Sequence, residues 1–217
     1  MAIRHGFATL QGFYQAEPLA PDPQAGFPYM RKCEIEGHPR NLQYVDVMHA
    51  DARKMLFIAE VLAGEASTES IGRVLVKFTD QYNETAHRLA AEADLAPKLY
   101  CVQEVSGLMM VVMELLEGCR VWGSVEKETE DARKRLQEFL KMFAENNLVH
   151  GDLRPPNILV GEGDKVRVVD YDWAGTHNVD TYPMAVNPNE TWADGVQAAK
   201  PMMKDHDEFM VARLLSV

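Results

Sequence analysis

Two short acidic motifs, separated by one predicted hairpin, hold the residues of this sequence that are best suited to chemistry. The first, HGDLRPPN at 150–157, places Asp152 five residues before Asn157 in a turn constrained by two prolines. The second, the DYD motif at 170–172, follows the next β-prone run. A carboxylate can orient a hydroxyl, and carboxylate and amide oxygens ligate Mg²⁺. The spacing therefore predicts a magnesium–phosphate site over residues 150–172.

A third candidate is Lys77, which ends the apolar run RVLVKF at 73–78. A lysine within a β-branched strand is unusual unless its ammonium group meets an anion. The alternative is a lysine at the strand edge whose stem is buried while its charge reaches water. Both interpretations stay open from the local sequence.

Composition narrows the class of protein. The 217 residues are 47% hydrophobic, which is enough for one domain or two small lobes. The net charge of −11 argues against nucleic acid or an anionic membrane as a partner. Three scattered cysteines do not form a disulfide framework, and no zinc motif is present. Without an apolar run of about 18 residues or a hydrophobic signal core, we expect a soluble, cytoplasmic protein.

The elements needed to position these residues can be placed from periodicity. Residues 1–43 hold five prolines and are predicted to form an irregular arm. Alternating and β-branched runs then predict strands, and Asp80 is expected to cap a helix that continues to about residue 93. The predicted strands span residues 42–49, 55–62, 73–78, 98–104 and 108–116.

A helical pattern follows the boundary at Glu117–Gly118. From Thr129 to Asn146, apolar residues recur along one helical face; they are Ala132, Leu136, Phe139, Leu140 and Phe143. The HGDLRPPN motif comes next, and the turn at 161–164 joins two short strands into a hairpin. A short helix is predicted over 205–215.

This order of elements and motifs, over roughly residues 44–176, resembles the protein-kinase-like superfamily. The chain looks most similar to the branch of small phosphotransferases that includes aminoglycoside phosphotransferases and choline kinases. The resemblance implies an α+β, two-lobed fold with a five-stranded antiparallel N-lobe sheet and one helix over residues 44–116. A reduced, mainly helical C-lobe with the catalytic hairpin would occupy residues 117–217.

The resemblance also implies a role for each residue that matches a family motif. Asp152 would be the catalytic base for the attacking hydroxyl, and Arg154 would add positive charge beside the transferred phosphate. Asn157 and Asp170 would ligate Mg²⁺. Lys77 would meet the α- and β-phosphates of ATP.

Two further assignments complete the nucleotide site that the resemblance implies. Glu84 on the following helix would steady Lys77, with Glu92 as the alternative. The segment VVMELLEG at 111–118 resembles the linker between lobes. In that linker the backbones of Glu114 and Leu116 would bind the adenine edge, and Met113 would lie at the rear of the pocket.

The sequence also departs from the family pattern. The place of a glycine-rich phosphate loop is taken by ADARK at 50–54, and Leu75 replaces the small residue above adenine. Gly151 replaces the arginine that reads a phosphorylated activation loop, and Asp172 replaces the last glycine of DFG. Few residues follow the DYD motif, although relatives usually form the acceptor pocket there.

Three functional hypotheses follow. The first is an ATP- and magnesium-dependent phosphotransferase that acts on an unidentified hydroxyl-bearing small molecule or protein. The alternative is a pseudokinase-like binding or scaffold module that works through protein partners. The third is an unrelated metal-dependent hydrolase that uses Asp152, Asp170 and Asp172.

Overall fold

The structure is a computed structural model that describes residues 28, 30–50, 55–62 and 71–216. Most of the expected N-terminal arm, and the predicted loops at 51–54 and 63–70, lie outside the described residues. The segment from Lys32 onward forms one compact unit by its internal contacts. No helix within the described ranges is both long and apolar enough to cross a membrane.

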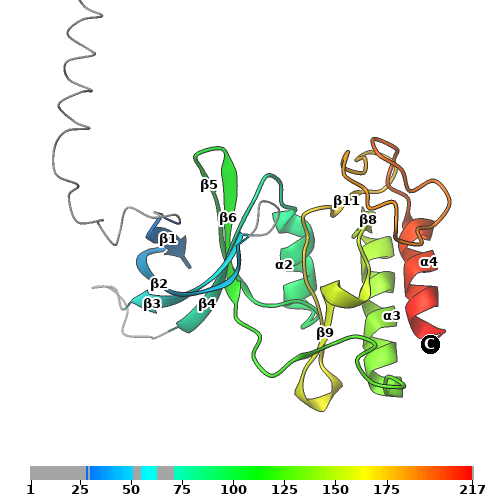
Figure 1. Ribbon diagram of the computed structural model, residues 1–217, viewed down its shortest axis with the longest axis horizontal. Coiled ribbons are helices and arrows are strands. Elements are labelled where there is room, and N and C mark those ends of the chain that lie inside the picture. The colour runs from blue at the N-terminus through cyan, green and yellow to red at the C-terminus, as the bar shows by residue number, and fades with distance from the viewer. Residues whose placement is uncertain (1–27, 29, 51–54, 63–70, 217) are drawn as a thin grey trace, which may run out of the picture. The chain divides into compact units, whose positions relative to one another are not determined.

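The N-terminal half forms an antiparallel sheet with the strand order β1-β2-β3-β4-β6-β5 (Figure 1). The sheet therefore has six strands, which corrects the predicted five. The strands are β1 (Lys32–Ile35), β2 (His38–Ala50), β3 (Met55–Leu62), β4 (Gly72–Thr79), β5 (Leu99–Val105) and β6 (Leu108–Glu114).

The additional strand, β1, lies inside the range expected to be irregular. Its residues alternate between exposed and buried, with Cys33 and Ile35 in the core. Glu36 and Gly37 both have positive φ, of 54° and 76°. Two such residues form a tight hairpin turn that matches the twist of the strands. The turn pairs β1 with the start of β2 at Lys32 and Asn41.

Helix α2 (Glu84–Glu92) follows β4 through the linker 80–83. Its N-cap is Asn83, whose side chain accepts a hydrogen bond from Ala86 N at 2.9 Å. The cap is thus three residues later than the predicted Asp80. The end of β4 and this linker bring the side chains of Thr79, Gln81 and Asn83 into hydrogen-bond contact with residues 172–174.

The C-terminal half contains short strands and two helices, α3 (Glu130–Glu145) and α4 (Lys204–Leu215), which pack side by side (Figure 1). The predicted face of α3 is confirmed, because Ala132, Leu136, Phe139 and Phe143 are buried. The short strands are β7 (Arg120–Val121), β8 (Leu148–Val149), β9 (Ile158–Val160), β10 (Val166–Val168) and β11 (Gly175–Thr176).

The predicted hairpin between the two acidic motifs is also confirmed, since β9 and β10 pair antiparallel with Val160 opposite Val166. Pro155–Asn157 form a 3-10 turn immediately before β9. Ile158, Val166 and Val168 point into the core that α3 covers. Burial of one face of the hairpin therefore holds both acidic motifs in place, since the HGDLRPPN motif leads into β9 and the DYD motif follows β10.

Candidate active site

A cavity of about 430 Å³ brings the two acidic motifs together with β4 and the segment after β6. Its apolar walls come from the sheet, the segment after β6 and the β9–β10 hairpin, and its polar end holds residues of both motifs. The apolar lining comprises Met48, Leu56, Leu75, Pro97, Met113, Leu115, Leu116, Pro156, Leu159, Val169 and Trp173. The polar lining comprises Lys77, Glu114, Asp152, Arg154, Asn157, Asp170 and Asp172.

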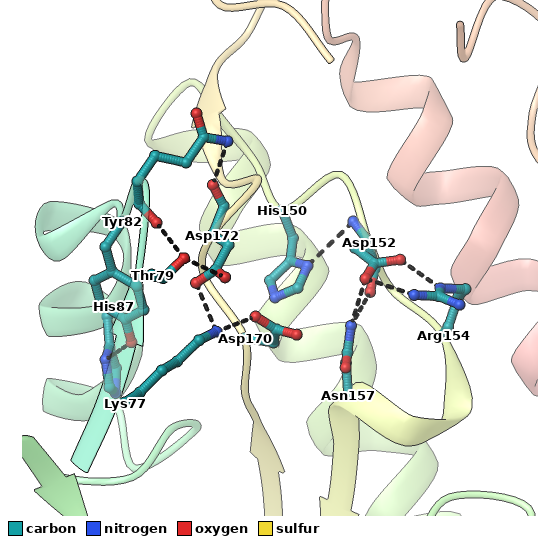
Figure 2. A network of polar contacts seen from close by, with 11 residues as sticks. Lys77, Thr79, Tyr82, His87, His150, Asp152, Arg154, Asn157, Asp170 and Asp172 are labelled. Atoms are coloured by element: carbon teal, nitrogen blue, oxygen red, sulfur yellow. Dashed lines mark hydrogen bonds and ion pairs between the residues drawn. The ribbon is translucent and has the colours of Figure 1, made fainter. Parts of the chain in front are cut away.

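Lys77 meets an anion, as one of its two interpretations predicted. Its Nζ lies 2.5 Å from Asp170 Oδ1 and 2.6 Å from Asp172 Oδ1, and the residue is only 8% exposed. Burial alone would lower the pKa of the Lys77 amine, but the charges of the two carboxylates outweigh it and raise that pKa. The lysine therefore stays protonated between two acids (Figure 2).

The structure does not bring Glu84 to Lys77. Glu84 opens α2 and binds Arg88 one turn along the same helix, at 2.7 Å. Glu92 is exposed at the end of that helix. Among the described residues, the ion pairs of Lys77 are those with the DYD motif. The partner expected on the helix thus differs from the partner found.

Asp172 is held on both its side chain and its backbone. Its Oδ2 accepts a hydrogen bond from Thr79 Oγ1 at 2.8 Å, and its carbonyl oxygen accepts one from Gln81 Nε2 at 2.9 Å. Burial raises the pKa of the Asp172 carboxyl to about 6, although the Lys77 charge opposes the shift. Asp170 adopts a left-handed backbone with φ of 73°, an uncommon conformation that aspartate tolerates.

Asp152 is enclosed by two donors on the other side of the polar end. Arg154 Nε and Nη2 donate to Asp152 Oδ1 and Oδ2 at 2.5 and 2.8 Å. Asn157 Nδ2 donates to Asp152 Oδ2 at 2.8 Å and to its carbonyl oxygen at 2.9 Å. Asp152 is 6% exposed. Burial raises the pKa of the Asp152 carboxyl despite the opposing charge of Arg154.

Arg154 is also held by a segment far along the chain. Its guanidinium lies 3.8 Å from a Glu190 oxygen and 5.5 Å from the centroid of the Trp192 ring. Glu190 lies 3.7 Å from Arg213 as well. Trp192 is fixed by a 2.7 Å hydrogen bond from its ring nitrogen to Asn187 O. The segment 187–192 therefore orients Arg154 against the catalytic turn.

The turn that carries the HGDLRPPN motif is held by α4. Asp207 accepts hydrogen bonds from His150 N at 2.6 Å and Gly151 N at 3.0 Å. Gly151 has φ of 79°, and a Cβ built there would lie 2.4 Å from Met202 Cε. Glycine is thus favoured at 151 by the left-handed backbone, and a Cβ there would require the end of the Met202 side chain to shift. Complete burial raises the pKa of Asp207 to about 7 even though both amides oppose the shift.

The linker residues lie where the cavity is most apolar. Met113, Glu114 and Leu116 all line it, as predicted for an adenine pocket. Glu114 N donates to Lys98 O at 2.8 Å. Within the described chain, Leu116 N has no hydrogen-bond partner.

Some residues of the site were not assigned to it from the sequence. Thr79 ends β4, and Gln81 lies in the linker that follows it. Both donate hydrogen bonds to the DYD motif, which lies about 90 residues further along the chain. Glu190 and Trp192 lie in a stretch without helical or strand periodicity. The sequence signal for Asp172 was the presence of two acids in the DYD motif, because two neighbouring carboxylates are stabilised by a cation between them. No group of three or more His, Cys, Asp or Glu side chains able to hold a metal occurs in the part of the chain described.

One comparison with known proteins matches part of the chain. Residues 78–183 match the family model RIO1, described as the RIO domain. No curated protein matches the chain. RIO domains are a family of atypical kinases within the protein-kinase-like superfamily. The match therefore supports the kinase-like superfamily, and the α+β fold agrees with it, but the match does not support the aminoglycoside phosphotransferase and choline kinase branch.

Proposed function

We propose that this chain is an ATP- and Mg²⁺-dependent phosphotransferase that moves the γ-phosphate to a hydroxyl of a small molecule or protein. The observation that carries the proposal is the composition of the 430 Å³ cavity. An apolar slot lined by Met113, Leu115 and Leu116 suits a planar base. Lys77, Asp170, Asn157 and Asp152 line the polar end of the same cavity, where phosphates would lie.

The chemistry of the donor set fits Mg²⁺. Lys77 carries one positive charge and its two aspartates carry two negative charges, so the group has a net charge of −1. Asn157 Nδ2 donates its hydrogen bonds to Asp152, so Asn157 Oδ1 is the side-chain atom that can ligate a cation. Asp170 and Asn157 would hold the cation, which would neutralise charge on the phosphates.

Asp152 is suited to accept the proton of an incoming hydroxyl. Its raised pKa makes the carboxylate more basic than an exposed aspartate, which favours proton uptake. Arg154 beside it would place positive charge near the transferred phosphoryl group. Lys77 would orient the α- and β-phosphates from the sheet side.

A pseudokinase-like binding module is the second candidate, and one contact favours it. Both oxygens of Asp152 already accept hydrogen bonds, from Arg154 and Asn157. A base in that state must release at least one donor before it can bind a hydroxyl. If Arg154 does not move, the same cavity can hold a nucleotide without transfer.

The test combines ATP turnover against a panel of hydroxyl acceptors with stabilisation by ADP and Mg²⁺. We expect Asp152→Asn to lower turnover by about 10²–10⁴-fold and to keep the nucleotide-dependent rise in Tm. Asp170→Asn should lose both. Asp131→Asn, an exposed acid on α3, is the matched control.

Each outcome separates the candidates. Turnover that survives Asp152→Asn unchanged would contradict its assignment as the base. Binding without turnover across the acceptor panel would favour the pseudokinase-like module. If nucleotide neither stabilises nor turns over, both proposals fail.

A further inference from the structure

The position of Lys77 presents a problem for the proposed site. Asp170 is both a candidate ligand of Mg²⁺ and a direct partner of Lys77, at 2.5 Å. A divalent cation on Asp170 would repel the Lys77 ammonium and compete with it for that carboxylate. Lys77 therefore needs a second carboxylate that stays with it, and Glu84, bound to Arg88, does not supply one.

Asp172 meets this requirement because a hydrogen-bonded belt fixes it to the linker after β4. Four hydrogen bonds join residues 79–83 to residues 171–174, and two of them hold Asp172 itself. The other two run from Asn83 N to Tyr171 O at 3.1 Å and from Asn83 Nδ2 to Ala174 O at 3.0 Å. The belt leaves Oδ1 of Asp172 directed at Lys77, at 2.6 Å (Figure 2).

Tyr171, between the two acids of the DYD motif, is also fixed. The Tyr171 ring stacks on His87 with centroids 4.6 Å apart and an angle of 6° between the planes. The Tyr171 hydroxyl donates to Val168 O at 3.1 Å. The motif is therefore held by residues 79–87 and by its own preceding strand, so Asp172 has little freedom to leave Lys77.

We propose that Asp172, held by Thr79, is the positioning residue that keeps Lys77 in place when Asp170 is required by Mg²⁺. This inference rests on the proposed function of the cavity. It assigns to the second acid of the DYD motif the role that the sequence assigned to an acid on helix α2. The lysine proposed to bind the phosphates and the motif proposed to bind Mg²⁺ would then be held by the same contacts.

The first test is the Mg²⁺ concentration that gives half-maximal ATP turnover. In Asp172→Asn, Lys77 has Asp170 as its remaining carboxylate, so lysine and cation compete for it. We expect the midpoint to rise by about tenfold, with turnover recovering at high Mg²⁺, because a charged hydrogen bond is lost. A purely structural role would lower turnover at every Mg²⁺ concentration and would leave the midpoint unmoved, which would overturn the proposal.

Matched variants test the belt and the alternative partner. Thr79→Val removes the hydroxyl with little change in shape, and we expect it to raise the midpoint by about threefold to fivefold. Thr79→Ser keeps the hydroxyl and should restore the wild-type midpoint. Glu84→Gln should shift the midpoint less than twofold. A shift in Glu84→Gln as large as that in Asp172→Asn would return the positioning role to α2 and overturn the proposal.

Asp172 could shift the midpoint as a metal ligand in its own right, and a double-mutant cycle with Lys77→Met separates the two roles. Stabilisation by Mg²⁺ with ADP is measured in all four proteins. If Asp172 acts through Lys77, Asp172→Asn weakens stabilisation in the wild-type background and has no further effect in Lys77→Met. An equal loss in both backgrounds contradicts the positioning role.

A readout without nucleotide keeps this inference separate from the proposed function. The rate at which acetic anhydride modifies the Lys77 amine, followed by peptide mass spectrometry, should rise several-fold in Asp172→Asn and stay unchanged in Glu84→Gln. If wild-type protein shows neither turnover nor stabilisation by nucleotide, the proposed function fails. The acylation rates then still decide whether Asp172 holds Lys77, and equal rates in Asp172→Asn and wild type would show that it does not.

Discussion

Two charged clusters face the same cavity, and they use similar groups in opposite proportions. The Lys77 cluster (Lys77, Asp170 and Asp172) places one cation between two carboxylates. The Asp152 cluster (Asp152, Arg154 and Asn157) places one carboxylate between a guanidinium and an amide. The first has a net charge of −1 and the second a net charge of zero. An added cation is therefore stabilised at the first cluster, whereas the second is suited to moving a proton.

The clusters also differ in what fixes them. The Lys77 cluster is anchored by the N-terminal half of the chain, through hydrogen bonds from Thr79 and Gln81 and the stack of Tyr171 on His87. The Asp152 cluster is anchored by the C-terminal part of the chain, because Asp207 holds its backbone and the segment 187–192 contacts Arg154. Changes near the Lys77 cluster should thus act on metal and nucleotide, and changes near the Asp152 cluster on turn stability and transfer.

For this comparison, the largest expected effect comes from Lys77→Met, which removes the cation of the Lys77 cluster and changes its net charge from −1 to −2. Turnover should fall by about 10²–10³-fold, because a charged contact to the phosphates is lost. Without ligand, the free energy of unfolding should fall by about 2 kcal/mol, since two partly buried carboxylates lose their shared cation. Mg²⁺ alone should restore part of this loss, which chemical denaturation with and without Mg²⁺ would measure.

The matched control for that experiment is Lys141→Met, which removes an exposed lysine 3.7 Å from Glu145. Its stability should change by less than about 1 kcal/mol and should not respond to Mg²⁺. If Mg²⁺ stabilises Lys77→Met no more than it stabilises wild type, the charge argument for a cation at this cluster is incorrect.

The backbone of the Asp152 cluster is tested by Gly151→Ala. The left-handed φ of 79° costs an L-residue about 1–2 kcal/mol, and the close approach to buried Met202 adds about 1–3 kcal/mol. Gly163 has a similar φ of 68° and no atom within 4 Å of a built Cβ. Gly163→Ala should therefore lose only the first contribution. If Gly151→Ala and Gly163→Ala lose the same unfolding free energy in urea denaturation, the Met202 side chain moves aside without an energetic cost.

Histidine titration gives the next effect. Burial lowers the pKa of His87, beneath the Lys77 cluster, from 6.5 to about 4. The unfolded chain then binds the proton more tightly, so stability present above pH 6.5 is lost as pH falls toward 4. The loss is about 3 kcal/mol at most. In His87→Gln this contribution is absent, and the difference in unfolding free energy from wild type should shrink by that amount between pH 7 and 4.

His150, beside the Asp152 cluster, has a pKa lowered to about 4 for the same reason and is present in both proteins. Its contribution cancels in the difference between wild type and His87→Gln. A difference that stays constant with pH would mean that His87 is protonated equally in the folded and unfolded chains.

The sequence was informative where local pattern decides structure. The apolar face of α3, the β9–β10 hairpin and the position of Lys77 in a strand follow from periodicity and turn residues within a few positions. The HGDLRPPN and DYD motifs brought Asp152, Asn157 and Asp170 to one cavity. These predictions succeeded because burial of one face of an element appears as a regular spacing of apolar residues at neighbouring positions.

The sequence was less informative where a side chain chooses among distant partners. Glu84, Glu92 and Asp172 were all acids that tertiary structure could bring to Lys77, and spacing along the chain cannot rank them. Strand β1 was missed because its partner on β2 follows a two-residue turn inside a proline-rich stretch. Segment 187–192 has no periodicity, so its contact with Arg154 exists only in the fold.

The smallest expected effect tests whether that distant segment contributes more than a surface contact. Glu190 lies 3.8 Å from Arg154 and 3.7 Å from Arg213, and its side chain is 27% exposed. Ion pairs with this exposure contribute about 0–1 kcal/mol, so Glu190→Gln should lower the unfolding free energy by less than about 1 kcal/mol. Arg154 keeps its two shorter bonds to Asp152, so turnover should stay within about twofold. Glu145→Gln removes a more exposed pair on α3 and is the control. If turnover in Glu190→Gln instead falls more than tenfold while stability is unchanged, Arg154 depends on both partners. The Asp152 cluster would then carry a net charge of −1 like the Lys77 cluster, and the contrast between the two clusters would be lost.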